Sequence, residues 1–144
     1  MKNLNDYIKE ALLLEYEMGG NDFKKTFSEY ERTHEVDPEL RNIFVDLHTI
    51  GQYYESIYKA ANGETDKFTH GLNEKTASEL INILEPIIGL LSNKTFDKKD
   101  SHRIEMEDIT DLKDTFESLT KLGKGCHAVE QLKTSAERIL NLLK

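Results

Sequence analysis

Apolar side chains recur every three or four residues along almost the whole chain, the spacing that places them on one side of an α-helix. Near the start, two such stripes are separated by Gly19-Gly20, a pair that readily ends a helix because glycine adopts the left-handed conformation. The members of the two stripes are Leu4, Ile8, Ala11 and Leu12, and then Phe23, Phe27 and Tyr30. We therefore expect a first helix and a short second helix in this part of the chain.

The third predicted helix has the clearest boundaries. Asp37 can accept hydrogen bonds from the first free amides, Pro38 suits the first helical position, and Glu39 complements the positive end of the helix dipole. Asn62-Gly63 should end this helix after about 25 residues, or roughly 37 Å. Its apolar side consists of Leu40, Ile43, Phe44, Leu47, Ile50, Tyr54, Ile57 and Tyr58. Because of its length, we expect this helix to be the central one against which the others pack.

Three more helices are expected in the second half of the chain. Asn73 can cap a fourth helix, in which Pro86 should cause a kink because its ring removes one backbone donor. A basic loop from Ser92 to Arg103 precedes the fifth helix, and Gly123 and Gly125 precede the sixth. The apolar members of the three stripes include Ala77, Leu80, Leu84 and Leu91, then Ile109, Leu112, Phe116 and Leu119, and finally Val129, Leu132, Ala136 and Ile139.

These stripes predict an all-α fold. Each helix must bury its apolar side against the others, and an antiparallel bundle of five to six helices is the simplest arrangement that does so. A length of 144 residues suits one domain, and only two prolines and eight glycines are present, too few for the many turns of a small β-domain. We therefore expect a single helical-bundle domain over residues 1–144.

The charge of the chain limits the kinds of partner that it can bind. There are 27 acidic and 19 basic side chains, for a formal net charge of −8. An acidic protein repels phosphate backbones and anionic membrane surfaces, so we expect neither nucleic acid nor a membrane as a direct partner. The single cysteine, Cys126, cannot form an internal disulfide, and no stretch reaches the roughly 20 apolar residues of a membrane span. These features predict a cytoplasmic protein.

The predicted fifth helix carries a concentration of acidic residues. Glu107, Asp111 and Asp114 fall on one side of it, with Asp108 and Glu117 beside them, and Lys113 is the only basic residue among them. Like charges four residues apart on a helix repel each other by a few tenths of a kcal/mol. This side of the helix is either a docking surface for a basic partner or a solvated face that keeps the protein soluble.

Two other groups of residues are candidates for partner binding. The basic loop concentrates five basic or titratable side chains, which could contact an acidic surface of another copy or simply belong to a mobile connection. Aromatic residues cluster on the third helix, where Tyr54 and Tyr58 could anchor either the core or an interface. The five residues of the loop are Lys94, Lys98, Lys99, His102 and Arg103.

The first 11 residues carry a family resemblance. The segment begins with Met1-Lys2, and after three further residues it continues with an acid, an aromatic, Ile, Lys and Glu-Ala, ending at Glu10 and Ala11. It resembles the capsid-targeting leader of internal head proteins in T-even bacteriophages. That resemblance implies removal of residues 1–10 by cleavage between Glu10 and Ala11, with a second candidate site after Glu15, and packaging in a phage capsid. A plain amphipathic first helix would explain part of the same pattern.

A second resemblance rests on Arg41-Asn42 followed by His48. This spacing is similar to the arginine–histidine motif of HEPN ribonucleases, which are also small helical bundles. The resemblance implies that Arg41 and His48 act on a scissile phosphate. Seven residues are two helical turns, so the two side chains would lie on one side of a helix about 10 Å apart.

The remaining candidate metal-binding and phosphate-binding motifs are incomplete. Cys126, His127 and Glu130 lie within about one turn but do not complete a metal coordination shell, and Glu31 and His34 have no second copy of their spacing. Gly123-Lys124-Gly125 lacks the spacing of a phosphate-binding loop. We therefore expect no metal and no cofactor.

These observations favour a non-enzymatic, acidic protein-interaction bundle, encoded by a phage and binding or inhibiting a host or virion protein. The residues expected to bind the partner are Glu107, Asp111, Asp114, Glu117, Tyr54 and Tyr58. The sequence is also compatible with a homodimer. The alternative is a HEPN-like ribonuclease that uses Arg41 and His48.

Overall fold

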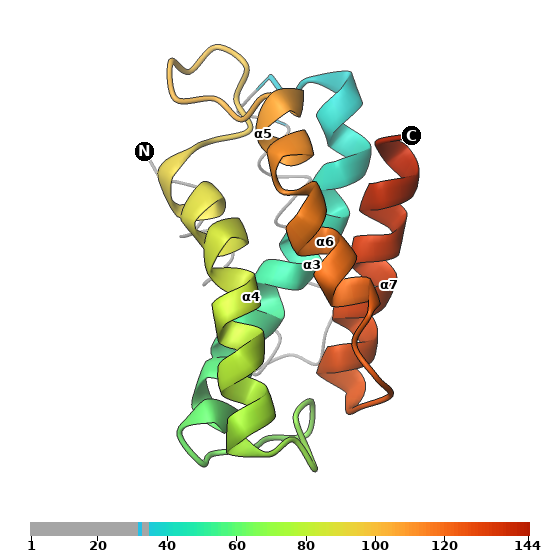
Figure 1. Cartoon of the computed structure of the whole chain (residues 1–144). Coiled ribbons are helices and arrows are strands. Elements are labelled where there is room, and N and C mark those ends of the chain that lie inside the picture. Colours follow the sequence, from blue (N-terminus) through green and yellow to red (C-terminus); the bar gives the residue numbers. More distant parts are fainter. Residues whose placement is uncertain (1–31, 33–34) are drawn as a thin grey trace.

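The computed structural model describes Arg32 and residues 35–144, and this part of the chain is all-α, as the sequence predicts (Figure 1). The helices, in chain order, are α3 (Pro38–Ala61), α4 (Glu74–Asn93), α5 (Met106–Asp111), α6 (Lys113–Thr120) and α7 (His127–Leu142). Pairing of extended backbone within the described residues is limited to isolated bridges at Val36–Asp97 and Thr95–Arg103. The two helices expected before residue 31 lie outside the described residues.

The long helices begin where their capping residues predict. Asp37 accepts a hydrogen bond from the amide of Glu39 at 2.9 Å, and Asn73 accepts one from the amide of Thr76 at 2.8 Å. Helix α3 ends at Ala61 with Asn62 as its C-cap, and the following Gly63 has a φ of +90°, which would be strained in a residue with a side chain. Helix α4 remains one helix through Pro86, which lies exposed on its surface.

The helices share one core. Helix α3 packs against both α4 and α7, and α6 packs against both α7 and α4. Successive long segments run in alternating directions, so that α4 and α7 start at the same end of the molecule (Figure 1). Side chains with no measurable exposure come from every one of these elements, and they include Leu47, Ile57, Leu84, Ile109, Phe116, Leu132 and Ile139.

The predicted fifth helix is two helices. Helix α5 ends at Leu112, whose backbone (φ −93°, ψ 8°) is not that of a regular helix, and α6 begins directly after it. The amide of Leu112 bonds to the carbonyl of Ile109, three residues back, which tightens the last turn. Helical bonding then resumes from Phe116 to Leu112 at 3.1 Å. The sequence contains no glycine or proline here, so its pattern gave no sign of the break.

The basic loop between α4 and α5 is fastened to the rest of the fold. Phe96 and Ile104 are buried, and Phe96 packs edge-on against Phe44 of α3 at 4.5 Å between ring centroids. The amide of Lys98 bonds to the carbonyl of Glu35 at 2.7 Å. Two buried side chains and this hydrogen bond therefore connect the loop to α3 and to the segment that precedes it.

None of the helices in the described residues is both long enough and apolar enough to span a bilayer.

Candidate functional site

The acidic residues predicted to bind a partner lie on two consecutive helices. Glu107 and Asp111 are exposed on α5, Asp114 is exposed on α6, and Glu117 is half-buried on α6. Because Ile109, Phe116 and Leu119 of the same helices are fully buried, the carboxylates lie on the side away from the core. We call Glu107, Asp111, Asp114 and Glu117 the acidic strip.

The neighbouring acids are neutralised within the fold. The ammonium of Lys94 lies 3.0 Å and 3.1 Å from the two carboxylate oxygens of Asp108, and the guanidinium of Arg103 lies 3.1 Å from Glu105. Asp108 also accepts a hydrogen bond from the amide of Glu105 at 2.9 Å, which completes a capping box at the start of α5. The basic loop therefore compensates for Glu105 and Asp108.

The acidic strip receives no such compensation. Within the described part of the chain, no lysine or arginine lies within ion-pair distance of any of its four carboxylates. The other two loop lysines, Lys98 and Lys99, approach Glu35 instead, at 3.9 Å each. Among the described residues, the strip is thus a group of four acids without ion pairs, beside a region where opposite charges are paired.

The two predicted tyrosines lie together on another surface. Tyr54 and Tyr58 of α3 have ring centroids 6.2 Å apart, and Tyr58 is 53% exposed, the most exposed large apolar side chain among the described residues. Partial burial raises the pKa of Tyr54, and the carboxylate of Glu85 on α4 and the neighbouring Tyr58 raise it further. The tyrosines therefore border the α3–α4 contact, whereas the acidic strip lies on α5 and α6, and they form two separate surfaces.

Arg41 and His48 do not form a shared surface site. Arg41 is exposed, whereas His48 is 1% exposed and stacks on Phe44 with 6.0 Å between the ring centroids. Burial lowers the pKa of His48 to about 4, so its ring is neutral at physiological pH. A ring covered in this way cannot reach an RNA phosphate without a rearrangement of α3, and the geometry does not favour the ribonuclease alternative.

Two contacts were not anticipated from the sequence. The hydroxyl of Tyr53 lies 3.0 Å from Nε2 of His127, which joins α3 to the first turn of α7 beside Phe68. The buried carboxylate of Asp46 on α3 lies 3.7 Å from the guanidinium of Arg138 on α7. Both pairs join residues far apart in the chain, so helical periodicity alone could not find them.

Cys126 occupies the residue before α7 and makes no capping hydrogen bond with its side chain. In the described residues, no group of three histidine, cysteine or acidic side chains is arranged to hold a metal ion. Glu130 instead accepts a hydrogen bond from the amide of Gly125 at 3.1 Å, so it stabilises the turn that leads into α7. The leader-like segment, with Glu10, Ala11 and Glu15, and the pair Glu31 and His34 lie outside the described residues.

No known protein family matches the chain, and no curated protein or solved structure matches it either.

Proposed function

We propose that the chain is a non-enzymatic protein-binding domain whose acidic strip docks a basic surface of a partner protein. The observation that carries the proposal is that Glu107, Asp111, Asp114 and Glu117 form no ion pair with any described lysine or arginine, beside a loop whose cations pair with other acids. Packed helices present these carboxylates on a fixed support, so little conformational entropy is lost when a partner binds. Charge complementarity of this kind steers encounter and favours particular partners.

The resemblance of residues 1–11 to a capsid-targeting leader extends the proposal to the origin of the partner. The chain is then a phage protein, and its partner is a protein of the host or of the virion. The exposed Tyr58, with Tyr54 beside it, is proposed as a second contact surface, since tyrosines are enriched at protein interfaces. The two surfaces can be tested separately because they lie on different helices.

The test is a quantitative affinity purification from the native cell with three forms of the full chain. The strip variant removes the charge but keeps the shape through Glu107→Gln, Asp111→Asn, Asp114→Asn and Glu117→Gln. The control variant removes the same charge from exposed acids on other parts of the surface, through Glu55→Gln, Glu64→Gln, Glu74→Gln and Glu79→Gln.

We expect the wild type and the control variant to recover the same amount of a partner. The strip variant should recover about tenfold less of it. Equal recovery of every partner by all three forms would refute the proposal. A loss that occurs equally in both variants would show that net charge matters and that the strip does not.

A further inference from the structure

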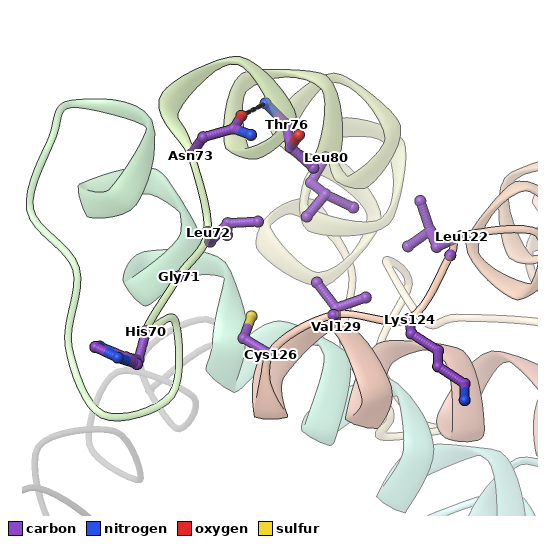
Figure 2. Close-up of a pocket in the computed structure, with 12 residues that line it drawn as sticks. His70, Gly71, Leu72, Asn73, Thr76, Leu80, Leu122, Lys124, Cys126 and Val129 are labelled. Atoms are coloured by element: carbon purple, nitrogen blue, oxygen red, sulfur yellow. Dashed lines mark hydrogen bonds between the residues drawn. The ribbon is translucent and has the colours of Figure 1, made fainter.

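A pocket of about 530 Å³ opens at the end of the molecule where α4 and α7 begin. Because these two helices run in the same direction, the turns that precede them lie side by side and form its walls. The side chains of Leu72, Leu80, Leu122 and Val129 converge on its interior, and the sulfur of Cys126 points in the same direction (Figure 2). A volume of this size is within the range of small-molecule sites, about 300–1,000 Å³.

The turns that form the pocket are shaped by glycine. Gly71 has a φ of +86°, which allows the sharp turn ahead of Asn73, the cap of α4. Gly125 packs so closely on α7 that a Cβ atom there would lie 3.0 Å from the Cβ of Val129. The capping hydrogen bond from Thr76 to Asn73 fixes the opposite wall (Figure 2). The pocket is thus bounded by ordered turns and helix ends.

The charge around the pocket is unlike that of the rest of the chain. No aspartate or glutamate is among the residues that line it, although the whole chain has a net charge of −8. The lining residues that can carry charge are Lys124 and His70, and their side chains are directed away from the apolar interior (Figure 2). The nearest carboxylate in sequence to the α7 wall, that of Glu130, is bonded to the amide of Gly125. The pocket therefore combines an apolar interior with a mouth that has no acidic lining residue and carries the exposed Lys124.

We propose that this pocket binds a small amphipathic anion, of the class of medium-chain carboxylates. The apolar tail lies among Leu72, Leu80, Leu122 and Val129, where it is removed from water. The carboxylate remains at the mouth, where Lys124 attracts it and no acidic residue of the lining repels it. A cationic head group on the same tail would lack that attraction.

The single thiol of the chain provides a direct test. Cys126 lines the pocket, and its alkylation by neutral iodoacetamide can be followed by intact mass on the full-length protein. Octanoate, octanol and octylammonium serve as probes with the same tail and different charge. Saturating octanoate should slow alkylation by about tenfold because the bound tail covers the sulfur, and octanol should need about a fivefold higher concentration for the same effect. Of the three probes, octylammonium should protect Cys126 from alkylation least.

Variants then locate the binding. Leu122→Trp fills the pocket from a half-buried position and should abolish the protection of Cys126. If this variant does not fold, Thr76→Phe fills the pocket from the opposite wall and should have the same effect. Lys124→Glu should weaken the binding of octanoate about fivefold. Lys121→Glu, on the same turn but outside the pocket, should leave this binding unchanged. The proposal is overturned if octanoate fails to protect Cys126, or if a folded pocket-filling variant is protected equally. It is also overturned if octylammonium protects as well as octanoate.

Discussion

At the scale of single residues, the core contains polar groups whose burial controls their ionisation. His48 is 1% exposed, and burial lowers its pKa to about 4. Asp46, two residues earlier, is also buried, and burial raises the pKa of its carboxyl above 3.8 although Arg138 acts in the opposite direction. Periodicity places both residues on α3 but cannot reveal that they are buried, because burial depends on how α3 packs against other elements.

His48 should make the protein sensitive to mild acid. Between its folded pKa of about 4 and its ordinary value of 6.5, the unfolded chain binds more protons than the native protein. The contribution of His48 to stability should therefore be complete above pH 6.5 and decrease as the pH falls to 4, by about 3 kcal/mol. The raised pKa of Asp46 acts in the opposite direction near the acid end of this range. Urea unfolding from pH 4 to 8 measures this slope. His48→Leu should flatten the slope, and the exposed control His102→Gln should leave it unchanged; an unchanged slope in His48→Leu contradicts the account.

The Asp46–Arg138 pair predicts a specific coupling between α3 and α7. Arg138→Ala should lower the free energy of unfolding by about 1 kcal/mol, because it leaves a buried carboxylate without its counter-charge. In an Asp46→Asn background the same change should cost almost nothing, because no charge remains to be compensated. A double-mutant cycle from urea unfolding measures the difference, and strictly additive costs would show that the pair is not coupled.

At the scale of helices, the boundaries that rest on capping chemistry could be predicted and the others could not. Asp37 and Asn73 fix the starts of α3 and α4 through local hydrogen bonds that two or three residues specify. The break at Leu112 lacks any glycine or proline signal and depends on how α5 and α6 pack. The acidic strip was visible in the sequence, but its separation from the tyrosines and the pairing of Lys94 with Asp108 depend on contacts between elements. The pocket beside Cys126 was missed for the same reason.

A better capping residue at the start of helix α7 should stabilise the protein. Cys126 has the extended backbone of a capping residue (φ −67°, ψ 175°), yet its side chain makes no capping hydrogen bond. Cys126→Ser supplies a hydroxyl that can accept one from the first turn, and it should raise the stability by about 0.5–1 kcal/mol. Thermal unfolding measures the gain, with Cys126→Ala as the control that offers no acceptor. A serine variant no more stable than the alanine variant contradicts the capping argument.

At the scale of the whole molecule, charge is distributed unevenly. The loop before α5 pairs its cations with Glu35, Glu105 and Asp108, and the acidic strip that follows has no ion pair with a described lysine or arginine. The net charge of −8 is therefore concentrated in part on one surface of packed helices. This distribution is what a protein that binds a basic partner requires, and it is the basis of the proposed function.

The proposed phage origin makes a separate prediction at this scale. If the protein is packaged, the form recovered from purified virions should begin at Ala11, because cleavage after Glu10 removes the leader-like segment. Intact-mass measurement of the virion protein distinguishes this form from the full chain. A virion protein that begins at Met1, or its absence from virions, rules out the packaging proposal without affecting the proposed role of the acidic strip.

The most direct measurement for the account is the affinity of the chain for the partner recovered by purification. Titration calorimetry at low and at physiological salt compares the wild type with the strip and control variants. The account predicts that the strip variant binds at least about tenfold more weakly than the control variant, and that its affinity depends less on salt. Equal affinities and equal salt dependence in the two variants would contradict the proposal that Glu107, Asp111, Asp114 and Glu117 form the docking surface.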